Sequence, residues 1–112
     1  MILIDTNFFI AVINQKDFYH KRAIELLEKL LLRDFGEKYT ISEVFTEIAT
    51  LLFKKTKRKD RVAKAWDLIY SEETAIVQPI IVNKEDIDNA WVVFQKYAAK
   101  KRPLSFVDCL LI

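Results

Sequence analysis

Short apolar runs alternate along the chain with stretches whose apolar residues recur at helical spacing. Residues 2–4, Ile-Leu-Ile, form a dense apolar block without polar alternation, which is typical of a strand covered on both faces. Residues 6–15 favour a short apolar helix. Asp5 therefore falls at the carboxyl end of a buried strand, with Thr6 and Asn7 in the turn after it. Ligands bind at this edge of open α/β sheets, and a carboxylate there is unfavourable without a partner.

The remaining stretches continue this alternation of strands and helices. Apolar spacing and capping residues predict a helix from 18 to about 33 capped by Asp17, a strand at 39–41 and a helix from 43 to about 55 capped by Ser42. A helix over about 59–71 and a strand over 75–82 that contains Pro79 are predicted next. A helix over 84–99, opened by the capping pair Asn83 and Asp86, and a last helix from Ser105 complete the prediction. Such an order implies an α/β fold with a parallel sheet and right-handed crossovers.

Length and composition favour one ordinary globular domain over residues 1–112. The chain is 52% hydrophobic and 30% charged, and its net charge of +2 is too small to identify a nucleic-acid binder. A single cysteine, Cys109, excludes an internal disulfide framework and suits the reducing cytoplasm. The apolar start is too short to cross a membrane and has no basic segment before it. We therefore expect a cytoplasmic protein without a membrane segment.

Three acids occupy positions where an idle carboxylate is unexpected. Asp5 follows a buried strand, and Asp108 is enclosed by apolar residues. Glu47 lies about 40° outside the apolar arc of its helix, at about 100° per residue. Three oxygen ligands at the carboxyl edge of a sheet suit a hard cation such as Mg²⁺ or Mn²⁺.

Each of these acids also has a purely structural interpretation. Asp108 lies three residues after Ser105 and forms a capping box with it. Glu47 is also compatible with a solvent-facing position, and Asp5 with a structural role. Composition and spacing alone therefore predict a candidate acidic site and no particular reaction.

Four stretches resemble the ordered motifs of PIN-domain ribonucleases, particularly the VapC-type toxins of toxin–antitoxin pairs. Residues 2–7 (Ile-Leu-Ile-Asp-Thr-Asn) are similar to the first motif, and residues 17–23 (Asp-Phe-Tyr-His-Lys-Arg-Ala) to the segment that opens the second helix. Residues 40–48 (Thr-Ile-Ser-Glu-Val-Phe-Thr-Glu-Ile) resemble the motif of the second acid, and residues 104–108 (Leu-Ser-Phe-Val-Asp) that of the third. The likeness covers the whole chain.

This resemblance implies a three-layer α/β/α domain with a mainly parallel sheet and a site for Mg²⁺ or Mn²⁺. The catalytic and metal-binding residues would be Asp5, Glu47 and Asp108. Asn7 and Ser105 would form hydrogen bonds around them. Glu43 is a rival to Glu47 one turn earlier, but the family places its acid at the second glutamate of this motif. The family pattern continues with a strand and a fourth acid that have no counterpart after Ile112, so we expect the sequence to be truncated at its C-terminus.

The function that the resemblance implies is metal-dependent hydrolysis of RNA phosphodiester bonds. The protein would be the toxin of a type II toxin–antitoxin pair, with RNA as substrate, a cognate antitoxin as partner and a homodimer as assembly. The alternative is a catalytically impaired PIN-like module that binds RNA or a protein. A phosphotransferase that uses Asp5 as nucleophile is disfavoured, because the second aspartate of that pattern is Asn7 here.

Two basic stretches are the candidates for contact with the RNA backbone. Their residues are Lys54, Lys55, Lys57 and Arg58 in the first stretch, and Lys100, Lys101 and Arg102 in the second. The first stretch is equally compatible with a solvated junction between helices. His20 is interpreted as a surface or supporting residue rather than a catalytic one. The aromatic side chains, Trp66 among them, fall mostly on apolar helix faces and are predicted to belong to the core.

Overall fold

The computed structural model describes residues 2–32 and 37–99. Its elements are β1 (Ile2–Leu3), α1 (Thr6–Ile13), α2 (His20–Leu32), β2 (Lys38–Ile41), α3 (Ser42–Thr56), α4 (Lys59–Tyr70), β3 (Gln78–Ile80) and α5 (Lys84–Tyr97). The chain divides into two compact units, residues 1–80 and residues 81–112. The first unit contains the three strands and helices α1 to α4, and the second contains α5. A single domain over residues 1–112 stays a prediction.

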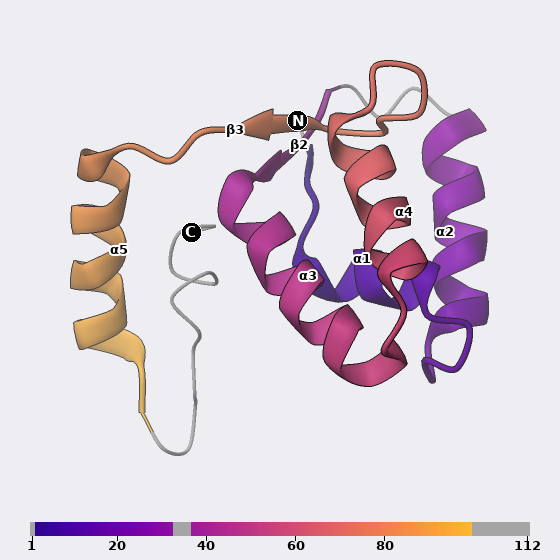
Figure 1. Cartoon of the computed structure of the whole chain (residues 1–112). Helices are drawn as coiled ribbons and strands as arrows, with labels where there is room; N and C mark the ends of the chain where they lie inside the picture. The colour runs from indigo at the N-terminus through magenta and orange to yellow at the C-terminus, as the bar shows by residue number, and fades with distance from the viewer. Residues whose placement is uncertain (1, 33–36, 100–112) are drawn as a thin grey trace. The chain divides into compact units, whose positions relative to one another are not determined.

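The three strands of the first unit form a parallel sheet in the order β1-β2-β3 (Figure 1). Leu3 pairs with Tyr39, and Thr40 with Pro79. The carboxyl ends of the strands therefore meet at one edge of the sheet. The α/β fold with a mainly parallel sheet is confirmed, and Pro79 lies in the outer strand β3, where a missing backbone donor is tolerated.

The third strand is shorter than the predicted 75–82. The amide nitrogens of Ala75 and Ile76 donate to the carbonyl oxygens of Ser71 and Leu68, at 2.8 and 2.9 Å. These bonds close the end of α4, so the two residues are not available for the sheet ladder. The strand begins only at Gln78.

The core of the first unit forms where α1 packs against α2, α3 and α4. Helix α3 contributes a stripe of fully buried residues at four-residue spacing, Val44, Ile48 and Leu52. Phe9 of α1 is equally buried. Burial of each large apolar side chain stabilises the fold by roughly 1.5–3 kcal/mol. This packing holds the N-terminal ends of α1 and α3 in place beside the sheet.

Two predicted helix starts were wrong by a small amount. Helix α2 begins at His20 rather than at residue 18, because the Asp17 carboxylate accepts the amide of Tyr19, two residues on, and closes a turn instead of a helix. Helix α3 includes Ser42, and its N-cap, Ile41, has no side-chain bond. The Ser42 hydroxyl donates to the Glu43 carboxylate rather than accepting a backbone amide.

Two further predictions about the helices have different outcomes. The capping box at the start of α5 is confirmed, since the Asn83 and Asp86 side chains each accept the other's backbone amide. Trp66 was wrongly assigned to the core, because it is 51% exposed. Its ring packs at the surface against Phe45 and Tyr70, with ring centroids 5.4 and 4.5 Å apart. Across the described residues, no helix is long and apolar enough to cross a membrane.

Candidate active site

The first strand ends in a fixed position beside β2. The amide of Ile4 donates to the carbonyl of Tyr39, and the hydroxyl of Thr40 donates to the carbonyl of Ile4, both at 2.8 Å. Thr40 is completely buried. Since Asp5 is the next residue, these two bonds determine where its backbone leaves the sheet.

Asp5 is the N-cap of α1 and its side chain is exposed. One carboxylate oxygen accepts the amide of Phe8 at 3.3 Å. The positive end of the α1 dipole favours a negative charge at this position. The other carboxylate oxygen has no hydrogen bond to any residue that the structure describes, so it is available to a ligand.

The neighbouring strand brings a second carboxylate to the same edge. Because Leu3 pairs with Tyr39, Asp5 lies level with Ile41, and α3 starts at the next residue. Glu43 lies in the first turn of α3 and accepts the Ser42 hydroxyl at 2.8 Å with Oε1. Its Oε2 is buried and has no hydrogen-bond partner among the described residues.

A second buried oxygen without a partner lies in the first turn of α1. Thr6 is 4% exposed, and its hydroxyl oxygen makes no hydrogen bond within the described part of the chain. Buried polar atoms in proteins are almost always paired with protein, water or an ion. The edge of the sheet therefore offers two buried oxygens, from Thr6 and Glu43, that are suited to an additional polar ligand.

Glu47 lies one turn after Glu43, about 6 Å further along α3. It is half-buried, at the margin of the apolar stripe beside the fully buried Ile48. It forms no hydrogen bond or ion pair with the residues that the structure describes. Asn7, in the first turn of α1, is exposed and likewise makes no such bond.

The described residues do not contain a complete set of ligands for a metal ion. Within residues 2–32 and 37–99 there is no group of three or more His, Cys, Asp or Glu side chains that would hold a metal ion. The donors present at the sheet edge are carboxylate and hydroxyl oxygens, which suit a hard cation. Asp108 and Ser105, predicted to complete the site, lie outside the described residues.

His20 has a structural contact rather than a place in this site. Its Nδ1 donates to the carbonyl of Ala11 near the end of α1, at 2.7 Å, which assigns the proton to that nitrogen. Helix α1 has eight residues and is about 12 Å long, and Asp5 lies at its opposite end. His20 therefore fixes the start of α2 against α1.

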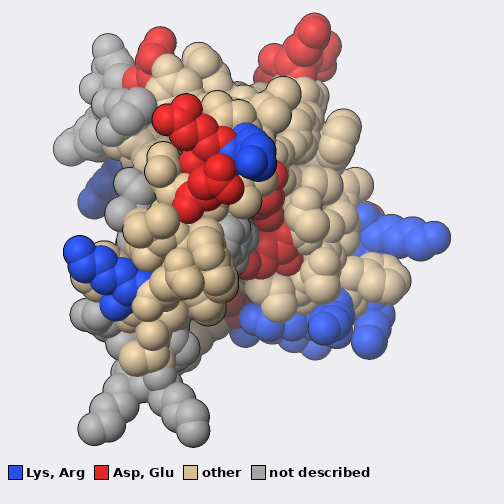
Figure 2. Space-filling view, turned by 90° about the vertical axis from the view of Figure 1, so that its left-hand side faces the viewer, with Lys and Arg blue, Asp and Glu red and all other residues tan. Residues whose placement is uncertain are grey.

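The first basic stretch surrounds the end of α3 and the start of α4. Lys54, Lys55, Lys57 and Arg58 are all exposed. Figure 2 shows Lys and Arg side chains gathered on one part of the surface, at the lower right. Lys57 adopts the left-handed conformation that ends α3. The second stretch, Lys100, Lys101 and Arg102, lies outside the described residues.

The structure is a parallel α/β fold with carboxylates at the carboxyl edge of its sheet. The model of the PIN domain family matches residues 2–112, so the chain belongs to the PIN domain family, as its motifs predicted. No curated protein matches the sequence.

A solved structure with the same fold is VapC20 of Mycobacterium tuberculosis, described as a sarcin–ricin loop cleaving toxin. It is similar over 99% of this chain and 78% of its own, with a TM-score of 0.80 and 24% sequence identity.

Two features of the site were missed from the sequence. The burial of Thr6 had a signal, because Thr6 precedes the buried Phe9, Ile10 and Ile13 by three, four and seven residues and so shares their helix face. The buried Oε2 of Glu43 had none, since it depends on how α3 packs beside the sheet.

Proposed function

We propose that this protein is a metal-dependent ribonuclease, the toxin of a type II toxin–antitoxin pair. The observation that supports this most is Asp5 at the carboxyl edge of the sheet, directly after the Ile4 carbonyl that Thr40 holds. One oxygen of its carboxylate accepts the amide of Phe8, and the other has no hydrogen bond to any described residue. By its resemblance to the first PIN motif, Asp5 would be the first acid of the site. The likeness to VapC20, described as a sarcin–ricin loop cleaving toxin, supports the same assignment.

The metal would be Mg²⁺ or Mn²⁺, held by Asp5, Glu47 and Asp108. Such a cation polarises the scissile phosphate and lowers the pKa of a bound water. Asp5 enters the site already oriented by the amide of Phe8. A carboxylate beside the attacking water would orient it or accept its proton. Asn7 and Ser105 would form hydrogen bonds around the acids.

The experiment is cleavage of RNA by the purified protein with Mn²⁺ or Mg²⁺. We expect cleavage to stop with EDTA and with Asp5→Asn, which keeps the side-chain size and removes the charge. Asp67→Asn is the matched control, because Asp67 is an exposed aspartate on α4 that takes no part in the site. Cleavage that survives both EDTA and Asp5→Asn would refute a metal mechanism.

The choice of acid on α3 is tested separately. We propose Glu47 as the metal ligand, from its place in the family motif, with Glu43 as a supporting acid whose buried Oε2 faces no partner in the described part of the chain. We expect Glu47→Gln to abolish Mn²⁺ binding in calorimetry and Glu43→Gln to weaken it. A larger loss of Mn²⁺ affinity in Glu43→Gln than in Glu47→Gln would instead assign Glu43 as the metal ligand.

A catalytically impaired PIN-like module is the second candidate. Such a module would bind RNA or a protein without cleavage, and Asp5→Asn would leave the binding unchanged.

The assembly that accompanies the toxin hypothesis is a cytoplasmic homodimer neutralised by a cognate antitoxin. Light scattering on the purified protein measures the dimer directly. Rescue of growth by the gene next to this one, when both are expressed together, identifies the antitoxin. A monomer, or growth arrest that no neighbouring gene relieves, would contradict this part of the proposal.

A further inference from the structure

We propose that a surface hollow separate from Asp5, Glu43 and Glu47 binds single-stranded RNA. This proposal rests on the ribonuclease function above. The hollow has a volume of about 620 Å³ and lies between the loop that follows α1 and the turn that joins α3 to α4. We call it the basic pocket. The residues of its lining that carry the argument are Lys16, Asp17, Phe18, Lys55, Arg58 and Arg61.

Charge is the first feature that suits RNA. Four of the lining side chains are cationic and one, Asp17, is anionic. Lys16, Lys55 and Arg61 form no ion pair with any residue in the described part of the chain. Together they attract a phosphate backbone without reading its sequence.

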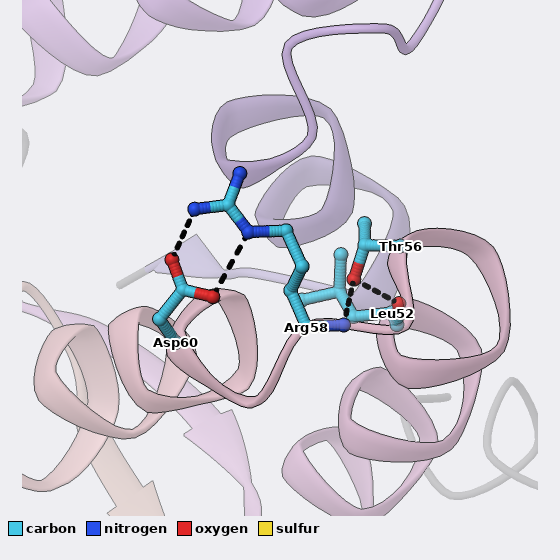
Figure 3. Close-up of polar contacts among 4 residues, drawn as sticks. All are labelled: Leu52, Thr56, Arg58 and Asp60. Carbon is cyan, nitrogen blue, oxygen red and sulfur yellow. Dashed lines mark hydrogen bonds and ion pairs between the residues drawn. The ribbon is translucent and has the colours of Figure 1, made fainter.

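The fourth cation, Arg58, is paired in a way that a phosphate would replace easily. Its guanidinium donates to both carboxylate oxygens of Asp60, at 3.0 and 2.7 Å (Figure 3). Both side chains are more than half exposed, at 55% and 57%. Exposed ion pairs stabilise a fold little, so Arg58 is able to exchange Asp60 for a phosphate at small cost.

An exposed aromatic ring is the second feature. Phe18 is 90% exposed, and Tyr19, against whose ring it packs edge to face at 4.9 Å, is 63% exposed. An aromatic ring beside several exposed cations matches RNA, whose bases stack on the ring while the cations hold the phosphates. An acidic peptide would use the cations and leave the ring without a partner.

Both walls of the basic pocket are held in shape before any ligand arrives. In the loop, Asn14 accepts the amide of Lys16 at 3.2 Å, and His20 anchors the far end of the loop to α1 at 2.7 Å. In the turn, the Thr56 hydroxyl donates to the last turn of α3 at 2.7 Å and accepts the amide of Arg58 at 3.2 Å (Figure 3). Such preorganisation reduces the entropy lost on binding.

The position of the basic pocket gives it a role in positioning the substrate. Lys55 lies eight residues after Glu47 on α3, which is about 12 Å along the helix. The loop after α1 is separated from Asp5 by the length of α1. A single strand held in the pocket would therefore run along the packed pair α1 and α3 toward the acids, and the pocket would contact nucleotides away from the scissile bond.

Fluorescence anisotropy with a labelled single-stranded RNA of about 12 nucleotides, in EDTA so that no cleavage occurs, tests the site. We expect Phe18→Ala to weaken RNA binding by roughly 5- to 150-fold, because one base loses its stacking partner. Phe18→Tyr keeps an aromatic ring and should bind RNA like the unchanged protein. A double variant with Lys55→Ala and Arg61→Ala should reduce the slope of the logarithm of the RNA association constant against the logarithm of the salt concentration. The expected reduction is about 1.4, or about 0.7 for each lost phosphate contact.

Matched controls separate a defined pocket from a diffuse basic surface. Lys59 and Lys64 are exposed cations of α4 that do not line the basic pocket. Lys59→Ala and Lys64→Ala should leave the RNA affinity and its salt dependence close to those of the unchanged protein. Circular dichroism establishes that each variant is folded.

Three results would overturn the proposal: equal losses of RNA affinity for Lys59→Ala and Lys55→Ala, unchanged RNA binding by Phe18→Ala, or stronger competition by polyglutamate than by unlabelled RNA. The last result would assign the surface to an acidic protein partner. Failure of the ribonuclease function is distinguishable. Pocket-dependent binding without cleavage in Mn²⁺ would refute the nuclease and keep the pocket. RNA cleavage by Phe18→Ala with an unchanged KM would keep the nuclease and refute the role of the pocket.

Discussion

Thr40→Val tests whether a single buried hydrogen bond positions the first acid. The substitution preserves the shape of a completely buried side chain but removes the hydroxyl that donates to the carbonyl of Ile4 at 2.8 Å. Asp5 follows Ile4 directly, so any loosening of this carbonyl is passed to the backbone that carries the carboxylate. We expect both a loss of stability and a loss of metal affinity.

The magnitude follows from the surroundings of the bond. A hydrogen bond contributes about 0.5–1.5 kcal/mol net, and a buried carbonyl that loses its donor raises the cost to about 1–3 kcal/mol. We take about 1–2 kcal/mol for Thr40→Val, which corresponds to a fall in Tm of roughly 4–15 °C for a domain of this size. Thr40→Ser keeps the hydroxyl and removes one buried methyl group, at a similar cost of about 1 kcal/mol.

The two variants therefore lose similar stability and differ in the bond to Ile4. Thermal unfolding followed by circular dichroism gives the stabilities, and calorimetry gives the Mn²⁺ affinity. Amide hydrogen exchange at residues 2–4 reports the end of β1 without reference to any metal. We expect faster exchange and weaker Mn²⁺ binding in Thr40→Val than in Thr40→Ser. Equal behaviour of the two variants in both measurements would refute the positioning role of this bond.

Two further predictions concern the turn between α3 and α4. Lys57 has φ 58°, a left-handed conformation that is unfavourable for a residue with a Cβ atom. Lys57→Gly should therefore raise the free energy of unfolding, measured in urea, by up to about 1 kcal/mol. Lys57→Ala removes the same charge but keeps the Cβ atom, so an equal gain in that variant would attribute the effect to charge and not to the backbone conformation. The hydrogen bonds from Arg58 hold the pKa of Asp60 below its usual value. The small stabilisation from this pair is therefore present above the pKa of an unfolded aspartate, about 3.9, and is lost as the pH falls through the lower pKa of the folded protein. In an NMR titration, Arg58→Ala should raise the pKa of Asp60 to the ordinary range, and an unchanged pKa would contradict the assigned cause.

Local sequence patterns were sufficient for the order of the described elements and for the place of Asp5 at the end of β1. The apolar block at residues 2–4 followed by a polar turn correctly predicted Asp5 at the end of a strand. The predicted coverage of this strand on both faces was wrong, because Leu3 is 44% exposed. The capping box of Asn83 and Asp86 was predictable because both partners lie within one helical turn. The PIN family was recognisable because its motifs keep their order along the chain.

Contacts between distant residues were decided only by the tertiary structure. The hydroxyl of Thr40 reaches a carbonyl 36 positions earlier, which depends on the register of β1 against β2. The buried Oε2 of Glu43 depends on the packing of α3. The basic pocket joins Lys16 and Phe18 to Lys55, because α1 and α3 pack together and bring their C-terminal ends to the same place. A sequence records which side chains are charged or apolar, whereas only the packed helices and the strand register determine which of them meet.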